Sequence, residues 1–306
     1  MAEPQTHDGT GAPATTKAIR TFEELSRADV PWAGGKGANL GELTRAGLPV
    51  PAGFVVGAPA YAAMCEQSDL RSHLAQLLDG LDVDDTTALA ARSEQARALV
   101  LGTPLPPALE RAIREAYAEL CGGDASNGSM APVAVRSSAT AEDTASASFA
   151  GMNESYLNVR GADPVIGAVR SCWASLFGAR TIFYRAKRGL GQADMDIAVV
   201  VQRQIDARHA GVMFTVDPAT GASDRLVIEA SIGLGESVVS GSVSPDRYVV
   251  DKASLAIVTT EVKPKESVLE AQSGGGVTRR ELQGADALRR VLDDGEVHQL
   301  AELAVR

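Results

Sequence analysis

The stretch that most constrains the fold is residues 133–159, VAVRSSATAEDTASASFAGMNESYLNV, which begins and ends like a strand. Between these ends the chain consists mostly of small and polar side chains, which cannot form a packed core. Loops of this length inside compact domains are usually functional or disordered. The stretch therefore predicts two strands joined by a loop with a role of its own.

The remaining sequence predicts a mixed α+β protein with helices concentrated early and strands late. A short helix follows Gly34 and ends at Gly47, helical spacing runs from 58 to 120 with breaks near 79–85 and 103–107, and a further helix lies between Asp163, its expected cap, and Gly189. Short β-branched runs predict strands at 197–205, 211–217, 225–231 and 247–251. We divide the chain into a disordered tail (1–17), an N-terminal lobe (18–200) and a C-terminal lobe (201–306).

Composition narrows the classes of partner. A net charge of −10 argues against nucleic acid, which is bound through clustered Lys and Arg, although a local pocket on an acidic protein can still be positive. No apolar run approaches the length of a membrane span, and the start has no apolar signal region. The three cysteines form no CxxC pair and are expected to be reduced, so we expect a cytoplasmic protein.

The GGKG element places Lys36 after two glycines at the start of a helix. Free backbone N–H groups and the helix dipole favour an anion there, and a lysine adds a full positive charge. The spacing of a Walker P-loop is absent. The alternative is a surface lysine beside a tight turn.

Arg136 follows an apolar run and is predicted to project from the end of a strand, where ligands of open α/β sheets bind. Its planar, permanently charged guanidinium suits phosphate oxygens. The alternative is a structural ion pair with Glu142 or Asp143. In the loop that follows, residues 146–151 are small enough to close over phosphates as a lid, the alternative being a flexible surface loop.

Two further positions have both a functional and a structural interpretation. The run VVVQRQI is apolar up to Gln202 and could connect two lobes beside an adenine ring, or be a plain core strand. Glu229 precedes a glycine-rich turn and could accept hydrogen bonds from ribose hydroxyls, or cap that turn.

Six stretches follow one another along the chain: GGKGANLGEL, AVRSSATAEDTASASFAGMNESYLNV, CWASLFGARTIFYRA, VVVQRQI, GVMFTVDP and IEASIGLGESVVSG. Together and in this order they resemble the nucleotide-binding domain of phosphoenolpyruvate synthases (pyruvate, water dikinases). Pyruvate, phosphate dikinases and rifampin phosphotransferases share this domain. The resemblance extends from about residue 19 to 265 and implies an ATP-grasp fold, in which two lobes enclose ATP.

The resemblance assigns roles by position. Lys36 and Arg136 match the phosphate-contacting lysine and arginine, and both are expected to be catalytic. The lid over the phosphates is matched by Ser148, Phe149, Ala150 and Gly151. The connector that meets adenine is matched by Gln202, Arg203, Gln204 and Ile205. Ser155 matches a polar position near the phosphates, and Glu229 an acidic position near the nucleotide.

The resemblance also implies ATP and Mg²⁺ as cofactors, a swivelling phosphohistidine domain and an acceptor-binding domain. The family's nucleotide domain closes with an acidic residue before a tryptophan and a strand ending Gln-x-Arg-Pro, whereas the only tryptophans here are Trp32 and Trp173. We therefore expect a C-terminal lobe truncated before its closing strand, incomplete for catalysis by itself, with its metal ligands unknown. The function implied first is the ATP-binding part of a phosphoenolpyruvate synthase. The alternatives are a rifampin-type phosphotransferase and a non-catalytic nucleotide-binding module.

Overall fold

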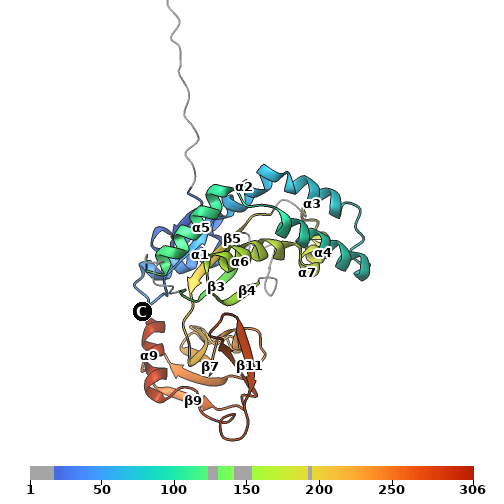
Figure 1. The fold of residues 1–306 in the computed structure, drawn as a ribbon. Coiled ribbons are helices and arrows are strands. Elements are labelled where there is room, and N and C mark those ends of the chain that lie inside the picture. Colours follow the sequence, from blue (N-terminus) through green and yellow to red (C-terminus); the bar gives the residue numbers. More distant parts are fainter. Residues whose placement is uncertain (1–16, 123–129, 141–153, 192–194) are drawn as a thin grey trace, which may run out of the picture.

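The computed structural model describes residues 17–122, 130–140, 154–191 and 195–306. It shows a mixed helix and sheet protein in two bodies, joined by a connector of residues 204–208 (Figure 1). The predicted tail and the four lid positions Ser148, Phe149, Ala150 and Gly151 lie outside the described residues, apart from residue 17 at the end of the tail. Within the described part, no helix has both the length and the apolar character needed to cross a membrane.

The N-terminal body is built on a five-stranded sheet in the order β1-β2-β5-β3-β4. Its strands are β1 (Ile19–Thr21), β2 (Gly53–Val56), β3 (Val133–Ala139), β4 (Ser155–Val159) and β5 (Ile197–Arg203). Its helices are α1 (Val30–Arg45), α2 (Ala58–Ser68), α3 (Leu70–Leu78), α4 (Thr86–Gly102), α5 (Pro107–Leu120), α6 (Ala162–Ala174) and α7 (Ala179–Lys187). Short 3₁₀ turns occupy Phe22–Glu24, Arg27–Asp29 and Ser175–Phe177.

Alternation along β5 separates the two faces of this sheet. Val199 and Val201 pack into the main core with helices α2 to α6, whereas Ala198 and Val200 face α1 in a smaller cluster around Trp32. Such alternation follows from the two-residue period of a strand, and a strand that is buried on both faces is apolar throughout. The sheet therefore presents one face to the main helical layer and the other to α1.

The C-terminal body contains a four-stranded antiparallel sheet in the order β6-β7-β8-β9, a separate hairpin and two helices. The elements are β6 (His209–Phe214), β7 (Arg225–Ile232), α8 (Glu236–Val239), β8 (Asp246–Asp251), β9 (Ile257–Glu261), β10 (Ser267–Ala271), β11 (Val277–Glu281) and α9 (Asp294–Val305). Helix α9 packs through Val297 and Ala301 onto one face of the sheet. This body thus has a core of its own.

The predicted helices between 58 and 120 and the strands from 197 to 251 are confirmed, but several boundaries differ. The boundary placed between 200 and 201 falls inside β5, because Gln202 and Arg203 still pair with β2 and β3. Helix α6 is capped by Gly161, so Asp163 lies in its first turn and not at the cap. The helix predicted to run on to Gly189 is broken at Gly178.

Candidate nucleotide site

The glycines of GGKG shape the start of the helix that carries Lys36. Gly34 has φ +67°, which breaks α1 there, so the helix restarts immediately before Lys36. A Cβ on Gly34 would lie 2.2 Å from the carbonyl oxygen of Ser138, so only glycine fits. The predicted glycine turn is present, although one helical turn also precedes it.

Ser138 fastens this turn to β3. Its hydroxyl donates to the carbonyl of Ala33 at 2.8 Å and accepts from the backbone N–H of Gly37 at 3.2 Å. That N–H belongs to the first turn of the restarted helix, where backbone donors lack helical acceptors. Ser138 lies two residues beyond Arg136 on the same face of β3, a spacing of roughly 7 Å along a strand. The Lys36 turn and Arg136 are thereby brought to one side of the sheet.

Lys36 also has a neighbour in α6. Burial raises the pKa of the Cys172 thiol, as does the charge of Glu154, while the positive charge of Lys36 acts to lower it. The positive charge of Lys36 therefore acts on a residue of α6 as well.

Arg136 lies in the middle of β3 and not at its end, because Ser137, Ser138 and Ala139 continue the pairing with β5. Its Nη2 donates to Oε1 of Gln202 at 2.6 Å. Its Nε is buried and has no hydrogen-bond partner among the described residues. Burial lowers the pKa of this guanidinium, and the carboxylate of Glu236 in α8 raises it. The site therefore contains a largely buried cation with an unused donor, and the charge of an acid in the other body acts on it.

The remaining predicted residues divide between this site and its surroundings. Ser155 is the register partner of Arg136 across β3 and β4, so it lies on the same face. Gln202 also donates from Nε2 to the carbonyl of Pro51 at 3.0 Å. Arg203 points away, because its guanidinium donates to the carbonyl of Leu120 at the end of α5.

The last connector residues lie between the two bodies. The side chain of Gln204 accepts from the backbone N–H of Asn158, and Ile205 is 56% exposed in a groove against α9. Glu229 lies on β7 opposite Arg247, on the sheet face away from the α9 core. The carboxylate that acts on Arg136 is Glu236, which we did not single out, although it belongs to the GLGE motif quoted for the resemblance.

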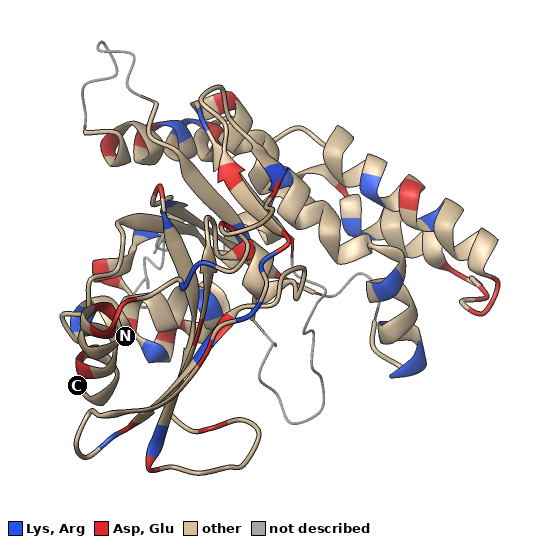
Figure 2. Ribbon diagram, turned by 90° about the horizontal axis from the view of Figure 1, so that it is seen from below, with Lys and Arg blue, Asp and Glu red and all other residues tan. Residues whose placement is uncertain are grey.

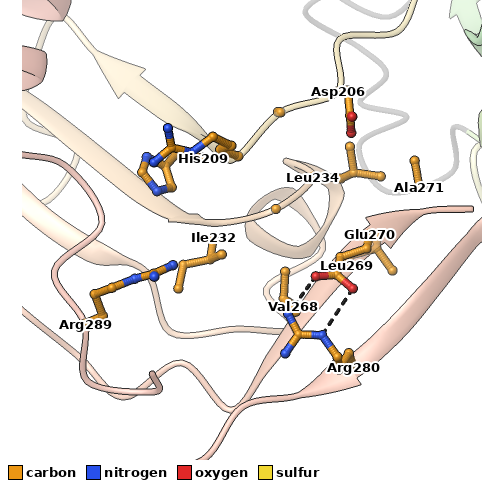
Figure 3. Close-up of a pocket in the computed structure, with 13 residues that line it drawn as sticks. Asp206, His209, Ile232, Leu234, Val268, Leu269, Glu270, Ala271, Arg280 and Arg289 are labelled. Carbon is orange, nitrogen blue, oxygen red and sulfur yellow. Dashed lines mark hydrogen bonds and ion pairs between the residues drawn. The ribbon is translucent and has the colours of Figure 1, made fainter. Parts of the chain in front are cut away.

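A cavity of about 420 Å³ lies against the connector, next to β7 and β10 (Figure 3). Arg208, His209 and Arg289 contribute to its lining, and Arg280 is held there by Glu270 at 2.7 Å. Over the whole molecule, acidic and basic residues are interspersed on both bodies (Figure 2). Arg136 therefore owes its environment to local placement and not to a basic surface.

Among the described residues no group of three or more His, Cys, Asp or Glu side chains could hold a metal ion. Magnesium, however, commonly binds through nucleotide phosphates with only one or two carboxylates from the protein.

Comparison with known proteins identifies relatives over nearly the entire chain. Residues 30–306 match the family model described as the pyruvate phosphate dikinase AMP/ATP-binding domain. A probable phosphoenolpyruvate synthase of Methanothermobacter thermautotrophicus is 45% identical over 300 residues, covering 98% of this chain and 43% of that protein. One of Methanocaldococcus jannaschii is 46% identical, covering 94% of this chain and 24% of that protein. The phosphoenolpyruvate synthase of Pyrococcus furiosus is 39% identical, covering 93% and 39% respectively. The chain thus spans less than half the length of these relatives.

Proposed function

The chain belongs to the family of the pyruvate phosphate dikinase AMP/ATP-binding domain, and on that basis we propose that it binds ATP between its two bodies as the nucleotide-binding part of a phosphoenolpyruvate synthase. The observation that carries the proposal is Arg136. A buried guanidinium with an unused N–H requires an acceptor, and a phosphate oxygen supplies one together with a compensating charge.

In the proposed complex the triphosphate lies along the α1 face of the sheet, from the connector past Arg136 towards Lys36. Gln202 holds Arg136 in place, and the lid of residues 146–151 is proposed to close over the phosphates. This is an ATP-grasp arrangement, with adenine at the connector. Phosphoryl transfer depends chiefly on such positioning and charge neutralisation. Mg²⁺ would enter with ATP, held by phosphate oxygens with a carboxylate such as Glu236 or Glu229, and would neutralise phosphate charge.

The proposed reaction of the complete enzyme uses two further domains. A histidine on the first takes the β- and γ-phosphoryl groups of ATP, which leaves AMP, and water releases the terminal group as phosphate. The remaining phosphoryl group passes from the histidine to the enol oxygen of pyruvate at the second domain, which gives phosphoenolpyruvate and free histidine. The names of the relatives favour pyruvate over an antibiotic as the acceptor.

The test is calorimetric titration of ATP into the parent chain and two variants. We expect Lys36→Ala and Arg136→Ala each to weaken binding by about 1.5–3 kcal/mol, the scale of hydrogen bonds to charged groups. Arg170→Ala is the matched control, since this arginine of α6 donates to the carbonyl of Thr103 in the helical layer and should leave the affinity unchanged. Unchanged affinity in both site variants would refute the proposed phosphate site. Release of AMP or ADP from ATP and magnesium above background would exclude a purely non-catalytic module.

A further inference from the structure

Asn158 has an unusual backbone for a strand residue. It lies in β4, is completely buried and has φ +52°, in the left-handed region that asparagine tolerates better than most residues. The register of β3 and β4 shifts there, since Val133 pairs with Val159 but Val135 with Tyr156, which leaves an extra residue on β4. Bulges of this kind re-aim a side chain. Here the side chain is aimed at the other body.

The groups of Asn158 tie β4 to both the connector and the C-terminal body. Its N–H donates to Oε1 of Gln204 at 2.6 Å. Its Nδ2 donates to the carbonyls of Gln272 at 2.7 Å and Gly276 at 2.6 Å, both in the turn of the β10–β11 hairpin. Its carbonyl accepts from the N–H of Gly276 at 3.0 Å, and Arg160 donates to its Oδ1 at 3.0 Å. We call this set of bonds the Asn158 clasp.

The hairpin held by the clasp supports the glycine-rich turn that leads into α8. The N–H of Leu234 donates to the carbonyl of Leu269 in β10 at 2.9 Å, and Gly233 bridges to the same residue. Gly233 has φ +82°, and a Cβ on it would lie 2.5 Å from that carbonyl oxygen. The close approach of turn and hairpin therefore requires glycine, and it fixes where α8 begins.

Helix α8 begins with Glu236, whose charge acts on Arg136 of the N-terminal body. A series of hydrogen bonds thus leads from β4 through the hairpin to the glycine turn before α8, and the last step, from Glu236 to Arg136 of β3, is electrostatic. Both ends of the series lie in the same sheet, because Ser155 of β4 is the register partner of Arg136.

We propose that Asn158 is a positioning residue of the nucleotide site, which sets Glu236 opposite Arg136 through the β10–β11 hairpin. The expected effect on nucleotide binding rests on the proposed function, whereas the hydrogen bonds of the Asn158 clasp do not depend on it. Asparagine suits the position because its amide supplies two donors for two carbonyls and one acceptor for Arg160, and because it tolerates the left-handed backbone.

The test is a double-mutant cycle read out by the affinity for metal-free ATP. In the parent, Glu236→Gln removes a negative charge beside the triphosphate and should strengthen binding by roughly fivefold. In the Asn158→Ala background Glu236 is no longer held in place, so the same substitution should change the affinity by less than about twofold. A merely structural Asn158 would leave the Glu236→Gln effect intact. Equal effects in both backgrounds, or none in the parent, overturn the proposal.

Amide hydrogen exchange without nucleotide separates this proposal from the function on which it rests. Asn158→Ala keeps the backbone bonds of the clasp but removes the two that Nδ2 donates to the hairpin turn. The hairpin is then held less firmly, so exchange of the Gly276 and Leu234 amides should accelerate by about tenfold, a change on the scale of one hydrogen bond. Ser93→Ala is the matched control, since it removes a 2.7 Å bond to the carbonyl of Phe177 inside the N-terminal body and should leave both amides unchanged. If the exchange rates of both amides are unchanged in Asn158→Ala, the claim that Asn158 holds the hairpin and the glycine turn in place is refuted, whether or not ATP binds. Failure of every variant to bind ATP, with faster exchange in Asn158→Ala, would refute the nucleotide function alone.

Discussion

At the scale of single residues, the described structure contains one fully buried ion pair, Lys265 with Asp246 at 2.6 Å. Asp246 also accepts from the backbone N–H groups of Lys263 and Val291, so its carboxylate links β8 to two loops of the C-terminal body. Nothing in the local sequence marks either residue as buried, because charged side chains are exposed by default and the pairing spans 19 positions.

Lys265→Met should therefore destabilise the protein by about 3–5 kcal/mol, because it leaves Asp246 buried without its counter-charge. Urea denaturation measures the loss. Glu270→Gln is the control, since it removes the partner of Arg280 in an exposed pair and should leave stability nearly unchanged. Similar losses of stability in both variants would show that burial does not determine how much these ion pairs contribute to stability.

His209 gives stability a pH dependence. Burial lowers its pKa below the usual 6.5, and although Glu296 opposes this shift, Arg208 and Arg289 add to it. The unfolded chain then binds more protons than the folded one just below pH 6.5, so stability should fall as the pH decreases through that window. Urea denaturation at about pH 7.5 and about pH 5.5 measures the fall, which His209→Gln should reduce. An undiminished fall in the variant would assign the effect to other groups.

At the scale of elements, α1 has a left-handed glycine near its start and another just beyond its end, with different surroundings. Gly34 lies against Ser138, whereas a Cβ on Gly47, at φ +72°, would meet nothing within 4 Å. Gly47→Ala should lower the free energy of unfolding by about 1–2 kcal/mol, which is the cost of the left-handed backbone for alanine alone. Gly34→Ala should cost clearly more, because the overlapping atoms include backbone, and it should also displace the Lys36 turn. If urea denaturation shows equal losses of stability in the two variants, then β3 shifts to accommodate the added methyl group at almost no cost in free energy.

The elements also show why sequence reasoning placed the end of β3 too early. Ser137 and Ser138 suggested a loop because small polar residues compete with regular backbone pairing. Both instead find partners, Ser137 at Glu154 and Ser138 at Ala33 and Gly37. These partners are 17 to 105 positions distant in the sequence. Every residue of strand β11 is exposed, so the strand has no alternation of buried and exposed positions from which it could have been predicted.

At the scale of the whole molecule, the sequence predicted Arg136 as a phosphate ligand but not the groups that set its environment. Gln202, which binds Arg136, is 66 positions away, and Glu236, whose charge acts on the pKa of Arg136, is 100 positions away, so only the fold relates them to Arg136. Motifs identify residue types suited to a ligand, whereas the register of β3 with β5 and the clasp at Asn158 depend on tertiary structure. The proposed nucleotide site includes residues of both bodies, so bound ATP should affect how each body opens.

The bodies have cores of unequal size among the described residues. The main cluster of the N-terminal body contains 31 buried residues, against nine in the C-terminal body. The smaller core should open at the lower free energy, so amides of β7 should exchange faster than those of β5. Native-state hydrogen exchange at Ile228 and Val200 measures both openings. Equal protection would indicate that the two bodies unfold as one unit.

Saturating ATP then tests whether the nucleotide lies between the bodies. A ligand that needs both bodies is lost when either opens, so at about 100 times its Kd it adds about 2.7 kcal/mol to both opening free energies. A ligand held by Lys36 and Arg136 alone protects β5 but leaves β7 unchanged. We expect equal increments at Ile228 and Val200, both reduced in Arg136→Ala. An increment confined to Val200 would place ATP on the N-terminal body only and remove Glu236 from the site.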